Sequence, residues 1–294
     1  MGMKRVIIAG AIFSLTNISF AMADIKVVTS IKPVHSLVSG VMVGVGVPAL
    51  IIDGAGSPHT YSLKPSQAKQ LQDAKLVFWM GDELETFLEG PIENIAQNAA
   101  AIKLIDAHGL KKMKFREGGM FDDHGHDDHD EHDHEKHDDH DDEKHAKKEH
   151  DDHGDHDGHD DHGHGEFDPH VWLDPVNAKA IVHEIEEALV KADPEHASIY
   201  EANAHKMMEK LDTLTAELRE ELEPVHEKGF IVFHDAYQYF EQRFDVAAIG
   251  SIAVSPEVMP GAERVSELRK KISDLSATCV FSEPQFEPKL VETL

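Results

Sequence analysis

The chain has 294 residues and a formal net charge of −28 at pH 7, from 28 Lys and Arg against 56 Asp and Glu. So acidic a balance disfavours nucleic acids and anionic membranes as partners and suits a cationic ligand. About 225 residues remain once a short leader and one low-complexity run are set aside, which is enough for one large domain or two small ones.

The first 23 residues have the layout of a secretory signal peptide. Two basic residues precede an apolar stretch at residues 6–15, and residues 20–23 (FAMA) form an A-x-A cleavage site. The alternative, an N-terminal membrane anchor, needs about 20 consecutive apolar residues. We therefore expect cleavage after Ala23 and a periplasmic mature protein. A lipid anchor is not expected, since no cysteine lies at the cleavage point.

Residues 25–105 alternate short apolar strands with amphipathic helices. Pro33 and Pro65 suit the first turns of two of these helices, and Pro91 is expected to break a third. Alternation of this kind is typical of βαβ units and a parallel sheet, so we predict an N-terminal α/β lobe at residues 24–174. The expected strands are residues 25–30, 44–52, 75–80 and 101–105, and the expected helices are residues 33–43, 65–73 and 83–97.

Residues 122–166 form a low-complexity run with 14 histidines, 21 acidic residues and four lysines. Neutral imidazole and carboxylate are ligands that zinc and similar ions take from proteins. A plain solvated linker, the alternative, does not need a histidine at nearly every third position. We predict an accessory zinc collector that is disordered without metal. Its histidines are His124, His126, His129, His132, His134, His137, His140, His145, His150, His153, His156, His159, His162 and His164.

After the run, Asp174 and Pro175 are expected to cap a linker helix at residues 175–192. A longer helix with an apolar stripe that includes Leu214 follows at residues 195–222, and βα alternation then resumes. We predict a second α/β lobe at residues 193–294. Its expected strands are residues 230–233, 246–252 and 279–281, and its expected helices are residues 237–243, 261–274 and an unfinished one at 288–294.

Cys279 is the only cysteine. A lone cysteine in an exported protein is either buried and inert or lacks its partner. The first alternative places it in a central strand. The second places another cysteine beyond Leu294, where the helix that starts at residue 288 would continue. Both alternatives remain open on these grounds.

Three histidines outside the run lie where a site between two lobes would need them. His59 follows a strand, His170 precedes the linker helix, and His234 ends a strand, with Asp235 expected to cap the next helix. Ligands of open parallel sheets bind at the carboxyl ends of the strands, so these side chains should point into the crevice between the lobes. Three imidazoles can hold a divalent ion with one position left for water or a carboxylate.

The other six histidines are less informative. His35 lies near the crevice and is a candidate ligand or supporting group. The remaining ones are expected on loops or solvated helix faces: His108, His183, His196, His205 and His226.

The sequence around the three crevice histidines is similar to that of a known family. Residues 54–66 (GAGSPHTYSLKPS), 170–175 (HVWLDP) and 233–237 (FHDAY) resemble motifs of the zinc-binding periplasmic proteins of ABC importers, the ZnuA-like family. The resemblance covers nearly the whole chain, including the acidic histidine-rich insertion. It implies two Rossmann-like lobes joined by a long rigid helix, with one zinc ion held between them by His59, His170 and His234.

Two features depart from the family pattern. Some members carry a glutamate ligand just before the first histidine, where this chain has Pro58. Manganese-type relatives add a carboxylate far downstream of the last strand, in a region expected to lie outside this sequence. The fourth ligand is therefore expected to be water or a residue beyond Leu294. Members that pair the strand cysteine with one near the C-terminus favour a partner for Cys279 there.

The predicted function is high-affinity periplasmic zinc capture and delivery to the membrane permease of a zinc ABC importer, by a monomer that is not an enzyme. Two alternatives remain. A zinc hydrolase would activate water on the three histidines, with Asp168 or Asp235 as general base. The sequence lacks HExxH, GxSxG and a Gly-rich phosphate loop, however. A stand-alone periplasmic metal buffer would differ only in having no transporter partner.

Overall fold

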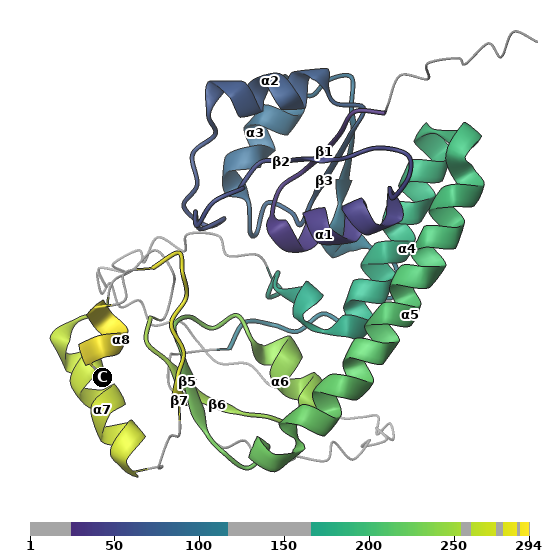
Figure 1. The fold of residues 1–294 in the computed structure, drawn as a ribbon. Helices are drawn as coiled ribbons and strands as arrows, with labels where there is room; N and C mark the ends of the chain where they lie inside the picture. The colour runs from purple at the N-terminus through teal and green to yellow at the C-terminus, as the bar shows by residue number, and fades with distance from the viewer. Residues whose placement is uncertain (1–24, 117–165, 254–259, 275–278, 287–288, 294) are drawn as a thin grey trace, which may run out of the picture.

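The computed structural model describes residues 25–116, 166–253, 260–274, 279–286 and 289–293. Within these ranges the chain forms two parallel β-sheets, one above the other, with helices packed around them (Figure 1). The predicted signal peptide and all fourteen histidines of the run lie outside the described residues. No helix in the described ranges is long and apolar enough to cross a membrane.

The first sheet has four parallel strands in the order β2-β1-β3-β4. β3 reads LVFW, and all four of its side chains are buried, as expected for a parallel strand covered on both faces. The strands are β1 (Val27–Thr29), β2 (Ala49–Leu50), β3 (Leu76–Trp79) and β4 (Ala100–Lys103), and the helices between them are α1 (Lys32–Val41), α2 (Pro65–Asp73) and α3 (Thr86–Asn94).

The second sheet has three parallel strands in the order β6-β5-β7. Its smaller core includes Ile231, Ile252 and Leu268, and Phe233 stacks on Phe286 with 4.2 Å between ring centroids. The strands are β5 (Phe230–Val232), β6 (Ala248–Ser251) and β7 (Cys279–Val280), and the helices are α6 (Gln238–Phe244), α7 (Ala262–Asp274) and α8 (Lys289–Thr293). Both sheets confirm the predicted mixed α/β class with parallel strands.

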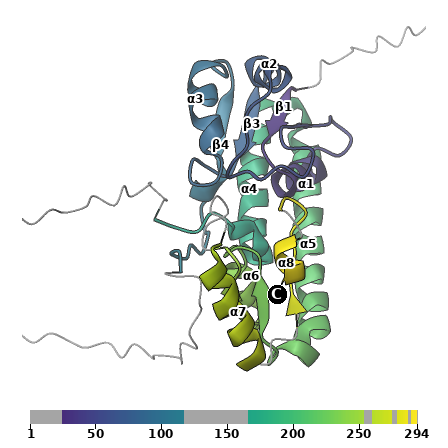
Figure 2. The ribbon, with the colours of Figure 1, turned by 90° about the vertical axis from the view of Figure 1, so that its left-hand side faces the viewer.

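Two long helices, α4 (Pro175–Ala192) and α5 (Ala197–Leu222), run side by side along one edge of the molecule (Figures 1 and 2). α4 begins as predicted, because the Asp174 carboxylate accepts a hydrogen bond from the Val176 amide at 2.8 Å. Contacts of α4 with α1 and β3 tie it to the first sheet, whereas α5 contacts α1, α4 and also α6 of the second half. α5 therefore contacts both halves, while the predicted linker helix α4 reaches the second half through its cap residue Asp174, which pairs with Arg243 of α6. The 26 residues of α5 extend about 39 Å.

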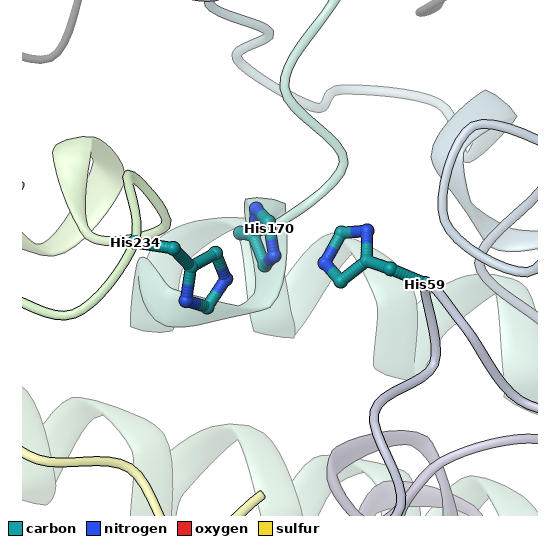
Figure 3. Close-up of side chains that lie close together, drawn as sticks. All are labelled: His59, His170 and His234. Carbon is teal, nitrogen blue, oxygen red and sulfur yellow. The ribbon is translucent and has the colours of Figure 1, made fainter. Parts of the chain in front are cut away.

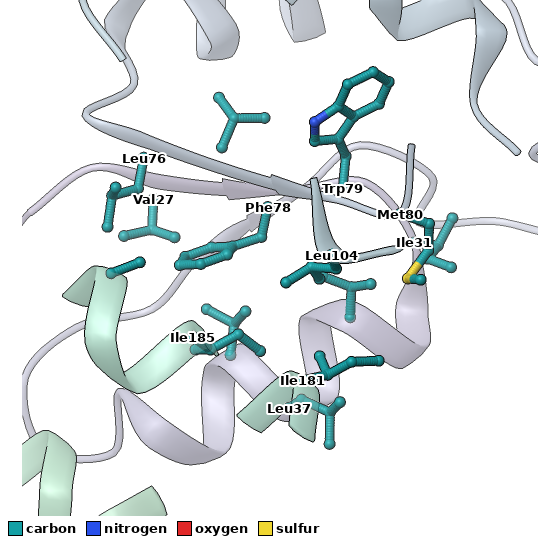
Figure 4. Packing of buried hydrophobic residues seen from close by; sticks show 14 of the residues in the cluster. Val27, Ile31, Leu37, Leu76, Phe78, Trp79, Met80, Leu104, Ile181 and Ile185 are labelled. Carbon is teal, nitrogen blue, oxygen red and sulfur yellow. The ribbon is translucent and has the colours of Figure 1, made fainter. Parts of the chain in front are cut away.

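The larger hydrophobic core lies between the first sheet and the helices α1 and α4. Ile181 and Ile185 of α4 are fully buried, and Ile185 lies beneath Phe78 of the sheet (Figure 4). Tyr200 and Ala204 of α5 belong to the same core. Because the first half of α5 is part of this core, the structure joins it to the N-terminal sheet, on the other side of the predicted boundary at residue 193.

Two local expectations were wrong, and one of the two alternatives for Cys279 is excluded. α3 runs through Pro91 without a break, because the fully buried Leu88 anchors the helix against the cost of an internal proline. Leu214 leaves the apolar stripe of α5 and is 42% exposed. Cys279 is exposed rather than buried, because β7 lies at the edge of the described part of the sheet.

Candidate metal centre

Three histidines from distant parts of the chain converge between the two sheets (Figure 3). His59 comes from the loop between β2 and α2, His170 directly precedes the short 3₁₀ turn Val171–Leu173, and His234 follows β5. One ring nitrogen of each lies within 4.8 Å of the other two. The ring centroids are 5.4 Å apart for His59–His170 and His170–His234, and 5.7 Å apart for His59–His234. This is the spacing of imidazoles that can share one divalent ion.

The rules of parallel sheets explain why His59 and His234 meet. β2 and β5 both end at the crevice, so the residues that follow them face each other across it. His170 is brought in by the start of α4, which Asp174 and Pro175 hold in place. His170 and His234 are only 5% and 6% exposed, so the imidazoles are largely shielded from water.

The orientation of His170 is set by Asp168. The Asp168 carboxylate oxygen Oδ1 lies 2.6 Å from Nδ1 of His170 and also accepts the His170 backbone N–H at 2.9 Å. Asp168 is completely buried. A carboxylate accepts the proton of Nδ1, so Nε2 is left with its lone pair toward the other two histidines.

Glu283 performs the same task for His234, and the sequence analysis missed it. Its Oε1 lies 2.8 Å from Nδ1 of His234, and the glutamate is 7% exposed. Nε2 of His234 is buried and has no hydrogen-bond partner among the described residues. Glu283 follows β7 just as His234 follows the neighbouring β5. The rule that ligands bind at the carboxyl ends of parallel strands (the strand-end rule) would therefore have indicated Glu283. Glu283 holds His234 rather than standing as a fourth ligand, so the expectation of water or a residue beyond Leu294 in that position stays a prediction.

The three histidines open onto a cavity of about 330 Å³. Its walls are largely apolar and include Ile52, Trp172 and Tyr237, with Glu283 beside the histidines. Burial and the Glu283 carboxylate raise the pKa of Tyr237 to about 12. The cavity is wide enough for an ion together with water.

The two carboxylates considered as general bases are both engaged. Asp168 is bound to His170, and Asp235 is paired with Arg116, which also contacts Glu241. The prediction that Asp235 caps the following helix was wrong, since Tyr237 occupies the cap position of α6 and no side chain caps it. Asp235 instead ties residues 111–116 to the second half of the molecule.

The histidines considered less informative lie apart from the cluster. His35 places Nε2 3.2 Å from the Pro48 carbonyl oxygen and is not one of the grouped residues. His196 contacts the Asp193 carboxylate at 2.8 Å. The remaining ones are exposed, as predicted: His108, His183, His205 and His226.

Known proteins share both the sequence and the fold of this chain. The chain is 60% identical over 268 residues to the high-affinity zinc uptake system protein ZnuA of Brucella abortus, covering 91% of this chain and 79% of that protein. The protein of the same name from Yersinia pestis is 33% identical, with 99% and 85% covered.

Among solved structures, a crystal structure of ZnuA superposes with a TM-score of 0.69 at 22% identity and covers 92% of this chain and 86% of that one. The periplasmic zinc-binding protein TroA of Treponema pallidum gives a TM-score of 0.68 at 19% identity, with 92% and 82% covered. At such identities the likeness concerns the fold. It confirms the predicted two-lobed α/β architecture.

The sequence profile of one family, described as the periplasmic zinc-uptake complex component A, matches residues 27–294. With nearly the whole chain matched, and relatives of the same name at up to 60% identity, this chain belongs to the ZnuA family.

Proposed function

We propose that this chain binds one zinc ion tightly between His59, His170 and His234 and delivers it to the membrane permease of an ABC importer. The observation that carries the proposal is the convergence of three imidazole nitrogens within 4.8 Å in a buried crevice. Membership of a family of zinc-uptake components supports zinc as the cargo.

The donor set itself favours zinc. Zinc accepts three neutral imidazoles readily, whereas manganese and magnesium prefer oxygen ligands. The carboxylates of Asp168 and Glu283 fix the ring orientation of the histidines that they hold and the tautomer that binds through Nε2. Protons compete with the metal for the same nitrogens, so the affinity is expected to fall on acidification.

Competition titration against a strong zinc chelator tests this set of ligands. His59→Ala and His234→Ala should each lose the tight site, with at least a hundredfold weaker binding. The matched controls are His35→Ala and His183→Ala, which remove histidines outside the cluster and should bind zinc as the parent chain does. Tight binding that survives both cluster substitutions would refute the proposed site.

The histidine-rich run is proposed as an accessory collector that raises the local zinc concentration near the crevice. Deleting residues 122–166 should lower the number of zinc ions bound per chain and leave the tight site unchanged. Loss of the tight site in this deletion would show that the run is part of the primary site.

Membership of the zinc-uptake family supports a transport role over storage or catalysis. We further propose that it acts as a monomer after cleavage behind Ala23. A hydrolase is not favoured, because Asp168 and Asp235 are both held by other groups. A strain without the protein should fail to grow under zinc chelation and be rescued by the parent chain but not by His59→Ala. Normal growth of that strain, with no second zinc importer present, would favour a buffer.

A further inference from the structure

Two glutamines complete a symmetrical arrangement behind the metal centre. On one side, the Gln285 side-chain amide donates to Oε2 of Glu283 at 2.9 Å, while Oε1 of Glu283 holds His234. On the other side, the Gln238 amide donates to Oδ2 of Asp168 at 2.6 Å, while Oδ1 of Asp168 holds His170. In both places a glutamine amide N–H donates to the carboxylate oxygen that does not contact the histidine.

The two carboxylates differ in their access to the cavity. Glu283 and Gln285 both line the cavity that the histidines share, whereas Asp168 and Gln238 do not. Asp168 is fully buried and also accepts the backbone N–H of His170. It is therefore held on His170 even without the hydrogen bond from Gln238. Glu283 has only the weaker additional contact with the His234 amide, at 3.4 Å.

Local structure holds Gln285 in place. The Phe286 amide donates to the Glu283 carbonyl oxygen at 3.1 Å, which closes a tight turn through Pro284 and Gln285. Phe286 in turn stacks on Phe233, the residue before His234. The turn that carries Gln285 is therefore fixed to the same strand end that carries the histidine.

A glutamate at the edge of a metal cavity has two competing roles. It can orient a ligating imidazole through Nδ1, or it can turn toward the ion and donate an oxygen itself. The second role adds a hard anionic ligand and makes the site more suitable for manganese. A hydrogen bond from an amide to the second oxygen stabilises the first role, because turning would break both contacts of the carboxylate.

We propose that Gln285 is a specificity-determining positioning residue, which keeps Glu283 on Nδ1 of His234 and off the metal, so that the protein ligands remain imidazoles. This inference rests on the proposed function, since it concerns the same three-histidine site. By holding the Glu283 carboxylate away from the metal, Gln285 favours zinc over manganese at this site.

The test compares Gln285→Met, which keeps the length of the side chain and removes the amide, with Gln238→Met as the matched control. Each full-length protein receives one equivalent of metal, so that the tight site fills first, and zinc and manganese affinities are measured by chelator competition. Gln285→Met is expected to lower the preference for zinc over manganese by about tenfold. Gln238→Met is expected to weaken both metals by similar factors, leaving their ratio unchanged.

A second substitution separates this role from a general loss of structure. In the double variant Glu283→Gln with Gln285→Met, residue 283 no longer offers an anionic oxygen, so the zinc preference should return toward the parent value. Zinc-loaded crystals should show Glu283 bonded to His234 in the parent chain. In Gln285→Met they should show a Glu283 oxygen about 2.0–2.2 Å from the ion.

Two results would overturn the inference: a Glu283 oxygen bound to zinc in the parent chain, or an unchanged metal ratio in Gln285→Met. Either result leaves zinc binding by the three histidines intact. Failure of the parent chain to bind zinc through those histidines is a different outcome, and it would overturn the proposed function together with this inference.

Discussion

The histidines of the crevice depend on buried carboxylates that lie next to them in space. Asp168 is the clearer case, because its side chain is fully buried and contacts both the ring and the backbone N–H of His170. Removing such a partner typically costs 10–100-fold in metal affinity. The residue therefore acts on zinc binding without being one of the three grouped ligands.

Asp168→Ala is expected to weaken zinc binding by about 10–100-fold, because His170 loses the group that fixes its tautomer and ring orientation. Chelator competition measures the change. The control is Asp212→Ala, which removes an exposed carboxylate that pairs with Lys179 and should not alter the affinity. Equal affinities of the two variants would contradict a role for Asp168 in orienting the ligand.

A second buried carboxylate, Glu85, affects stability rather than binding. Burial raises its pKa from an ordinary value near 4.5 to about 7, although the Met80 and Gly81 amides donate to it at 2.9 and 3.0 Å. Between these two values the folded chain keeps the proton and the unfolded chain has lost it. Protonated Glu85 therefore makes its full contribution to stability below pH 4.5. As the pH rises from 4.5 to about 7 this contribution is lost, and the free energy of unfolding falls by about 3 kcal/mol.

Glu85→Gln is expected to abolish this part of the pH dependence, since the amide keeps an acceptor oxygen and does not ionise. Urea unfolding of the metal-free proteins at pH 4.5, 5.5, 6.5 and 7.5 measures the difference between variant and parent. The exposed Glu89→Gln serves as control and should follow the parent curve. Parallel curves for Glu85→Gln and the parent would contradict the assignment.

Among the secondary-structure elements, α4 connects stability most directly with the site, because it begins at Pro175, five residues after His170. Asp174 caps the helix and also receives Arg243 of α6 through two hydrogen bonds of 2.7 and 2.6 Å. The side chain of Asp174 is 5% exposed. One carboxylate thus fixes the start of the helix and joins it to the second half of the molecule.

Asp174→Ala is expected to lower the free energy of unfolding by about 2–4 kcal/mol, from the lost cap and from an Arg243 guanidinium left without its partner. Denaturant unfolding measures the loss. Arg243→Ala alone should cost less, and the double variant should cost less than the two single variants combined, because they share one interaction. Strict additivity would show that the pair does not act as a unit.

At the scale of the whole molecule, α6 joins the two halves. Tyr239 of this helix belongs to the larger hydrophobic core and is 2% exposed. Its hydroxyl accepts the Met113 N–H at 2.9 Å and donates to the Asp168 carbonyl oxygen at 2.7 Å. Met113 and Asp168, which lie in the sequence before and after the histidine-rich run, are therefore both hydrogen-bonded to α6 through the side chain of Tyr239.

Tyr239→Phe is expected to lower the free energy of unfolding by about 2–4 kcal/mol, since a buried donor and a buried acceptor both lose their partner. It should also loosen the coupling of the two halves. Unfolding followed by the fluorescence of Trp79 and Trp172, both in the first half, should then no longer coincide with unfolding followed by far-ultraviolet circular dichroism, which reports both halves. Tyr61→Phe removes a hydroxyl contact with Gln67 inside the N-terminal half and should keep the two transitions together. Coincident transitions in Tyr239→Phe would contradict the coupling.

Local patterns were sufficient for most elements and for the three histidines. Alternating apolar strands and amphipathic helices predicted the parallel α/β architecture, and α2 was predicted with the bounds that the structure has. The strand-end rule predicted that His59 and His234 would face one crevice, because that rule depends only on the direction of parallel strands. The predicted break at Pro91 was wrong because a helix that is anchored by a buried residue tolerates a local defect. The predicted burial of Leu214 was wrong because only the fold decides which turns of α5 meet another element.

The sequence by itself determined the chemistry of this protein: its α/β class, its family motifs and the imidazoles available to a cation. Tertiary structure decided which groups support them. Glu283 reaches His234 across 49 positions of sequence, Gln238 reaches Asp168 across 70, and α5 packs against both α1 and α6. These contacts join residues of separate segments, so neither hydrophobic periodicity nor short motifs report them. They exist only because the packed core holds those segments together.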